Sequence, residues 1–288
     1  MEPSLEELAA QVPEHVFFGT STWTYPGWKG SIYKEVYSSD KKFRQESLRE
    51  YSAYPLFRTV GIDSFFYTPP TVEKLRQYAE LVPPEFKWAQ KVWEHITVPV
   101  FPKHKRYGSL AGKKNDSFLD ANLFTEAVLK PNLETGCKEH LGPLIFQFPT
   151  INRSILTAEV FINSLHGFLS ALPKEALLAV EIRNPEYLCK QYFDALNDTG
   201  ATHCFNHWNY MPPLIKQMKA AATAGGLQAP GYVARLLTPR NVSYQDAVQR
   251  FSPYDTVKEA NEEMRADAVR LAKRAIERSV PAFIIVNN

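Results

Sequence analysis

The chain has 288 residues, of which 44% are hydrophobic and 13% aromatic; this composition argues against disorder and suits one large α/β domain or two small ones. A net charge of +2 is nearly balanced, which argues against obligate non-specific binding of nucleic acid. The three cysteines lack any CxxC spacing, so we expect reduced thiols and a cytoplasmic protein. No apolar run approaches the ~20 residues that cross a bilayer, so no membrane association is expected.

Helix and strand patterns alternate along the whole chain. Residues 4–11 carry a capping box and are expected to form a short helix within an N-terminal extension, residues 1–15. Strands are expected at residues 16–19, 57–63, 86–92, 144–147, 177–185, 202–205, 232–236 and 282–286. The helices expected between them span residues 43–54, 71–81, 117–129, 157–171, 186–196, 214–222 and 258–278.

The fifth strand shows the clearest pattern. Alternate residues of a strand lie on opposite faces, so one face here is aliphatic and the other is small, then acidic, then basic. The two faces are Leu178, Val180 and Ile182, and Ala179, Glu181 and Arg183. A carboxylate and a guanidinium two residues apart on one face can pair, which favours a barrel strand whose inner face ends at a polar mouth.

Eight strands alternating with helices over about the ~250 residues usual for this fold predict a TIM (β/α)8 barrel, residues 16–288. No internal repeat or linker is present, so one domain is favoured. The sequence lacks the final helix that would cover strands eight and one. We therefore expect that flank to be covered by another segment or subunit, or the chain to be trimmed.

Polar and aromatic side chains follow most of the expected strands. Chemistry in such barrels gathers at the carboxyl ends of the strands, where these side chains would converge. The candidate site comprises Ser21, Trp23, Asp63, Tyr67, Lys91, Gln147, Glu181, Arg183, Arg235 and Asn287.

Three of these residues are candidate catalytic groups. Glu181 is either a general acid/base or an ion-pair anchor, and flanking cations would lower its pKa, which favours the anchor. Asp63 either works with Glu181 as an acid/base couple or caps the turn that follows it. Lys91 either forms a Schiff base or, as we favour, neutralises Glu181 or binds a ligand anion.

The other candidates are expected to bind a ligand. Arg183 and Arg235 are either clamps for a carboxylate or phosphate, or buried ion-pair partners. Trp23 and Tyr67 either stack on a base or sugar ring or, as favoured, pack as an aromatic lid without a ligand. The polar side chains Ser21, Gln147 and Asn287 complete the mouth.

A long irregular segment, residues 94–116, carries five basic side chains that could contact a nucleic acid. These are Lys103, Lys105, Arg106, Lys113 and Lys114. A solvated loop is the favoured interpretation, and phosphate contact with a nucleic acid is the alternative. The histidines have no metal-binding spacing, and no phosphate-binding glycine motif is present, so neither a metal nor a cofactor is expected.

Taken together, these residues resemble the domain of unknown function family 72, the YecE-like proteins. The match covers residues 18–25, 28–30, 33, 59–60, 63–64, 66–67, 91, 96–97, 141–144, 146–149, 180–181, 183, 235 and 287–288. The resemblance implies a TIM barrel of unsettled activity, and the family's likeness to endonuclease IV-type barrels has prompted proposals of nucleic-acid binding. The family commonly has Glu at the position of Gly61 and His at that of Leu237.

Three functions stay open at this point. The first is a barrel enzyme, or a degenerate one, that binds a phosphate- or carboxylate-bearing sugar or nucleotide at its mouth. The second is a nucleic-acid-binding module, and the third is a non-catalytic protein whose uncovered flank binds a partner. The absence of the carboxylate and the imidazole at residues 61 and 237 leaves catalysis open, and the oligomeric state is not predicted.

Overall fold

The computed structural model describes residues 3–287. Asn288, the last position of the resemblance to family 72, therefore lies outside the described residues, as do Met1 and Glu2. Eight parallel strands close into a barrel in sequence order, with β8 hydrogen-bonded to β1. The strands are β1 Val16–Thr20, β2 Thr59–Ile62, β3 Lys87–Lys91, β4 Leu141–Gln147, β5 Leu178–Glu181, β6 Thr202–His207, β7 Tyr232–Leu236 and β8 Ala282–Val286. The predicted TIM-barrel fold is confirmed.

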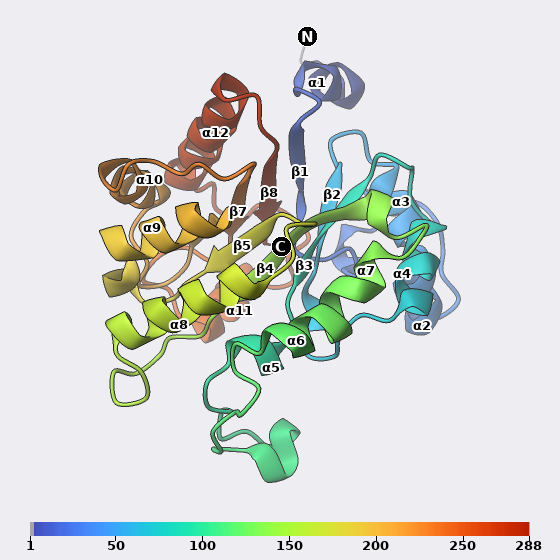
Figure 1. Ribbon diagram of the computed structural model, residues 1–288. Helices are drawn as coiled ribbons and strands as arrows, with labels where there is room; N and C mark the ends of the chain where they lie inside the picture. The colour runs from blue at the N-terminus through green and yellow to red at the C-terminus, as the bar shows by residue number, and fades with distance from the viewer. Residues whose placement is uncertain (1–2, 288) are drawn as a thin grey trace.

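Helices surround this barrel (Figure 1). The α-helices are α1 Leu5–Gln11, α2 Asp40–Glu46, α3 Leu48–Ser52, α4 Val72–Ala79, α5 Glu94–Thr97, α6 Ala121–Phe124, α7 Lys130–Leu133, α8 Ala158–Ala171, α9 Lys190–Thr199, α10 Leu214–Thr223, α11 Tyr244–Phe251 and α12 Glu262–Glu277. Turns of 3-10 or π-helix are η1 Pro26–Trp28, η2 Asp63–Phe66, η3 Lys105–Leu110, η4 Thr125–Leu129, η5 Lys138–His140 and η6 Pro185–Tyr187. Among the described residues, none of these helices combines the length and apolarity needed to span a membrane.

Side-chain caps explain where several helices begin. The hydroxyls of Thr71 and Thr157 accept hydrogen bonds from backbone N–H groups three residues later and start α4 and α8. Asp120 caps α6 in the same way, so this helix begins later than the predicted residue 117. It then continues through the π-helical turn η4 into α7.

Two other helical regions differ from the sequence expectation. The helix expected at residues 43–54 is divided into α2 and α3, which meet at the buried residue Ser47. The last long helix begins at Glu262, where the side chain of Asn261 caps it. Helix α11, which lies in the preceding segment, was not predicted.

The core has two layers around the strands. The outward side chains of β5, Leu178 and Val180, pack with Ile182 against the surrounding helices, while Ala179 faces the barrel interior. Interior neighbours of Ala179 include Ile145, Cys204, Val233 and Phe283. The alternation of aliphatic and small or charged residues along the fifth strand therefore predicted correctly which side chains face the helices and which face the barrel interior.

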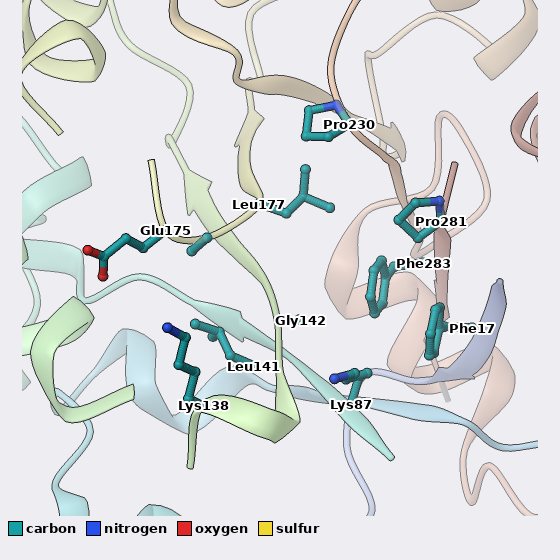
Figure 2. Close-up of a pocket in the computed structure, with 11 residues that line it drawn as sticks. Phe17, Lys87, Lys138, Leu141, Gly142, Glu175, Leu177, Pro230, Pro281 and Phe283 are labelled. Carbon is teal, nitrogen blue, oxygen red and sulfur yellow. The ribbon is translucent and has the colours of Figure 1, made fainter. Parts of the chain in front are cut away.

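Two aromatic rings stack at the amino end of the barrel. The rings of Phe17 and Phe283 stack with centroids 4.6 Å apart and planes within 8° of parallel. They line a cavity of about 320 Å³, beside which the side chains of Lys87, Lys138 and Glu175 lie (Figure 2). The polar candidate residues lie at the opposite, carboxyl end.

The flank formed by β8 and β1 is covered unevenly. Within residues 3–287 no helix follows β8. Helix α12 packs against β7 and β8, and the ring of Phe57 contacts that of Phe18 on β1. The outward-facing side chains of Phe18 and Val286 remain only half-buried.

Candidate functional site

Most of the candidate residues end a strand or directly follow one. Lys91, Gln147 and Glu181 are the last residues of β3, β4 and β5, and Gln147 is the register partner of Glu181. Asp63 follows β2, and Arg235 is the next-to-last residue of β7. Parallel strands bring all these positions to one end of the barrel, as the strand pattern predicted.

Glu181 is the buried centre of this end, with no exposed side-chain surface. One carboxylate oxygen, Oε1, accepts hydrogen bonds from Arg183, 2.6 Å from Nη2 and 2.9 Å from Nε. The other, Oε2, lies 2.7 Å from Nη1 of Arg235. Both oxygens of Glu181 are therefore bonded to guanidinium groups.

Arg235 bridges the two carboxylates. Its Nη2 lies 3.1 and 3.3 Å from the oxygens of Asp63, and Nζ of Lys91 lies 2.8 Å from Oδ2 of the same carboxylate. Oε1 of Gln147 accepts hydrogen bonds from Arg235 and Arg183, at 3.0 and 3.2 Å. These contacts join six side chains, which we call the mouth network: Asp63, Lys91, Gln147, Glu181, Arg183 and Arg235.

The cations of the network determine the ionisation of its buried groups. Burial opposes ionisation of Glu181, but the charges of Arg235 and Arg183 outweigh it and lower the pKa of Glu181 to about 2. Burial, together with the charge of Arg235, lowers the pKa of Lys91 even though Asp63 acts in the opposite direction. For Arg235, burial is outweighed by Asp63 and Glu181, so its pKa is raised.

Aromatic side chains surround the mouth network. The guanidinium of Arg183 lies 4.0 Å from the ring centroid of Trp208, and Nζ of Lys91 lies 5.4 Å from that of Phe66. Trp208 was not among the predicted site residues because the sixth strand was expected to end at residue 205. The strand continues to His207, so Trp208 directly follows its carboxyl end.

The remaining candidate residues lie around the network without bonding to it. The hydroxyl of Ser21 donates to Oδ1 of Asn287 at 2.9 Å and closes the seam between β1 and β8. Tyr67 is 55% exposed. Trp23 is only 4% exposed and packs edge-to-face on Tyr78 at 5.0 Å, so most of its ring lies in the core.

Gly61 and Leu237 occupy the two positions at which the family resemblance implied a further polar side chain, and neither supplies one. A Cβ at Gly61 would lie 2.9 Å from the backbone oxygen of Ser21, so the backbone that directly follows β1 occupies the space of a side chain. Leu237 contributes its backbone N–H to the carbonyl of His207, 3.2 Å away. The mouth network forms without either group.

All five basic residues of the segment 94–116 are exposed, but Arg106 also contacts the body of the protein. Arg106 donates to Oε2 of the buried Glu94 at 2.9 Å, and its guanidinium lies 4.5 Å from the ring centroids of both Tyr67 and Tyr107. The segment around η3 projects from the body of the barrel at the bottom of Figure 1. The other four basic residues, Lys103, Lys105, Lys113 and Lys114, are exposed.

A buried histidine lies between β6 and the helices outside it. His203 donates from Nε2 to Gln217 at 3.0 Å, and its Nδ1 accepts from the hydroxyl of Tyr192 at 2.9 Å. Burial lowers the pKa of His203 to about 4, so the ring is neutral. Within residues 3–287, no three His, Cys, Asp or Glu side chains gather as metal ligands would, and the three cysteines are free thiols.

Comparison with known proteins places this geometry in a family. The structure resembles that of a DUF72 family protein from Thermotoga maritima, with a TM-score of 0.57 and 20% sequence identity over 95% of this chain and 92% of that one. Two crystal structures of a DUF72 family protein from Enterococcus faecalis give TM-scores of 0.53 and 0.58 at 14% and 15% identity. They cover 95% of this chain and 90% and 88% of theirs.

None of the curated proteins compared with the chain matches it. The family model described as "Protein of unknown function DUF72" matches residues 17–288, which includes the barrel except its first residue, Val16. At these identities the solved structures support the fold alone, whereas the family match extends over nearly the whole chain. The chain therefore belongs to the DUF72 family.

Proposed function

We propose that the mouth network binds a small ligand bearing a phosphate or carboxylate, of the sugar or nucleotide type. The observation that carries this proposal is the charge balance. Three cations, Lys91, Arg183 and Arg235, bond to only two carboxylates, Asp63 and Glu181, which leaves a net charge of 3 − 2 = +1. A buried excess charge is costly, and an anionic ligand would compensate it.

Free donors support the same proposal. An ammonium has three N–H donors, and Lys91 uses one of them on Asp63. Among residues 3–287, Nη1 of Arg183 has no hydrogen-bond partner. These groups can donate to a ligand oxygen, while Trp208 and the exposed ring of Tyr67 offer faces on which a sugar or base can stack.

The three candidate catalytic groups take different roles in this proposal. Glu181 acts as the anchor, because both its oxygens are bonded to arginines and its lowered pKa makes it a poor proton donor. Asp63 pairs with Lys91, and burial together with the charge of Arg235 lowers the pKa of Lys91. Lys91 is therefore the group of the three best suited to proton transfer or nucleophilic attack, and any reaction would involve the Asp63–Lys91 pair.

The test changes the charge of the network in both directions. Lys91→Met removes the excess charge and the two free donors of the ammonium, so the affinity for glucose 6-phosphate in a calorimetric titration should fall about tenfold or more. Asp63→Asn adds to the excess positive charge and should raise the affinity for glucose 6-phosphate. Lys87→Met, on the same strand but at the amino end of the barrel, is the matched control and should bind as the wild type does.

Two results would overturn the proposal. One is wild-type protein that binds neither glucose 6-phosphate nor inorganic phosphate at low ionic strength. The other is an equal loss of affinity in the Lys91→Met and Lys87→Met variants, because only the first of these lysines belongs to the mouth network.

Nucleic-acid binding is a second candidate function, favoured by the shape and charge of the projecting segment. Lys103, Lys105, Lys113 and Lys114 are exposed and form no ion pair with another described residue. Replacing these four lysines with Gln should flatten the salt dependence of oligonucleotide binding, because each phosphate contact adds to that slope. Arg106→Gln should change it less, since Arg106 is paired with Glu94. Absence of binding at low salt would remove this candidate.

A further inference from the structure

We infer that a second anion subsite lies beside the mouth network, so that the ligand carries two anionic groups joined by a hydroxyl-bearing spacer. This inference rests on the proposed function and names its ligand class: a sugar bisphosphate or a phosphorylated sugar acid. The subsite is a cavity of about 260 Å³ between the loops that follow β1 and β2 and the helices α2 and α4.

The cavity adjoins the mouth network at Asp63, because Asp63 lines the cavity and also pairs with Lys91 and Arg235. The next residue, Ser64, also lines the cavity and is exposed, so its hydroxyl is available to a ligand. A ligand bound at Lys91 can therefore extend past Asp63 into this second space.

Two cations line the cavity from opposite helices. Arg44 comes from α2 and Lys74 from α4, and neither has a carboxylate partner among residues 3–287. Nζ of Lys74 lies 4.8 Å from the ring centroid of Tyr78, which also lines the cavity. These two charges are available for an anion.

Two other cations of the same helices have acidic partners. Lys42 of α2 pairs with Glu46 at 3.8 Å, and Arg76 of α4 approaches Glu134 at 4.0 Å. Lys41 of α2 forms no ion pair with a described residue either, but it does not line the cavity. Arg44 and Lys74 are therefore the two cations of these helices that face the cavity without an acidic partner among the described residues.

A buried donor gives independent support. Trp23 lines the cavity, is 4% exposed, and its indole N–H has no acceptor among the described residues. Buried N–H groups in folded proteins almost always have a partner. An anionic oxygen that reached this nitrogen from the cavity would supply the missing acceptor.

The charges favour an anion in spite of Asp63. That carboxylate is already compensated by Lys91 and Arg235, at 2.8 and 3.1 Å. Counting Arg44 and Lys74 with the three cations of the mouth network gives five cations against two carboxylates, an excess of three. Asp63 between the two subsites is an acceptor, which suits a spacer that carries hydroxyl groups.

The experiment compares fructose 1,6-bisphosphate with fructose 6-phosphate in calorimetric titrations at one ionic strength. Wild-type protein should bind the bisphosphate about tenfold or more tightly than the monophosphate, since charge-assisted hydrogen bonds are the strong ones. The double variant Arg44→Gln/Lys74→Gln should reduce this advantage to about twofold or less, and leave the monophosphate affinity unchanged.

The double variant Lys42→Gln/Arg76→Gln is the matched control, because it removes equal charge from the same helices away from the cavity. A bisphosphate advantage that survives Arg44→Gln/Lys74→Gln, or falls equally in the control, would overturn the second subsite. The mouth proposal would survive that result if Lys91→Met still weakened monophosphate binding about tenfold or more. Wild-type protein that binds neither sugar phosphate would overturn both.

Discussion

The replacement Glu181→Gln removes one buried charge with little change of shape. The pKa of Glu181 falls from its ordinary value of 4.5 to about 2 on folding. A tenfold change in proton affinity corresponds to about 1.4 kcal/mol, so the ionised carboxylate contributes about 3 kcal/mol to the free energy of unfolding at pH 7. A neutral amide leaves Arg183 and Arg235 without their shared carboxylate, and we expect the variant to lose about this much.

The pH dependence has a defined sign. Because folding lowers the pKa of Glu181, its contribution is complete above pH 4.5 and is lost as the pH falls toward 2. The difference between wild type and variant should therefore narrow from about 3 kcal/mol at pH 7 to about 2 kcal/mol at pH 3.5. Urea unfolding followed by circular dichroism at the two pH values measures both quantities.

Glu126→Gln serves as the control, since that carboxylate forms an exposed pair with Lys130 and should contribute less than about 1 kcal/mol. A loss below about 1 kcal/mol in Glu181→Gln at pH 7 would refute the reasoning, because buried charges that lose a partner cost more than exposed ones. A difference that does not change between the two pH values would refute the assigned pKa.

Three further outcomes are expected. Burial lowers the pKa of His203 from 6.5 to about 4, so its neutral ring contributes stability that is complete above pH 6.5 and is lost as the pH falls toward 4. The free energy of unfolding of the wild type should therefore fall by up to about 3 kcal/mol across that range. His203→Gln should flatten this dependence, and urea unfolding measures it. Gly61→Ala should destabilise the protein by about 1–3 kcal/mol, because the new Cβ meets the backbone of Ser21. The control Gly167→Ala lies in helix α8, where a Cβ has open space, and should stabilise the protein by up to about 1 kcal/mol. Equal shifts of the thermal unfolding midpoint in the two variants would contradict this prediction. Trp208→Leu removes the ring that stacks on Arg183. After correction for the difference in buried area, it should lower the free energy of unfolding by about 1 kcal/mol more than the control Trp28→Leu does. Equal corrected losses in the two variants would argue against the stacking.

The strands were largely predictable because their patterns are local. Residues 232–236 and 282–286 were predicted at their observed bounds, since each is a short, mainly apolar run that begins within two residues of a proline. The sixth strand was predicted too short because Asn206 and His207 are polar, yet both are buried at the end of β6. That error concealed Trp208, which follows directly.

The mouth network was predictable for a topological reason. A parallel barrel brings the carboxyl ends of its strands together, so Glu181, Arg183 and Arg235 had to meet if the strands were correct. The pairings within the network could not be read from the sequence, because they depend on strand register and side-chain reach. Arg235, for example, bridges Glu181 and Asp63 from the far side of the barrel.

The surroundings of the network were not predictable. Trp23 was expected at the mouth, but a residue just beyond a strand can turn toward either the interior or the covering helices, and this one packs against Tyr78. Arg106 was grouped with the exposed lysines because nothing local identifies its partner, Glu94. Arg44 lies on a helix, outside the strand-end rule altogether.

Anomalous diffraction from crystals of the protein soaked in selenate tests the central claim most directly. The account predicts a selenium peak at the mouth within hydrogen-bonding distance of Lys91 and Arg183, and loss of that peak in the Lys91→Met variant. Peaks confined to the projecting lysines or to the cavity beside Lys87 and Lys138, with none at the mouth, would contradict it.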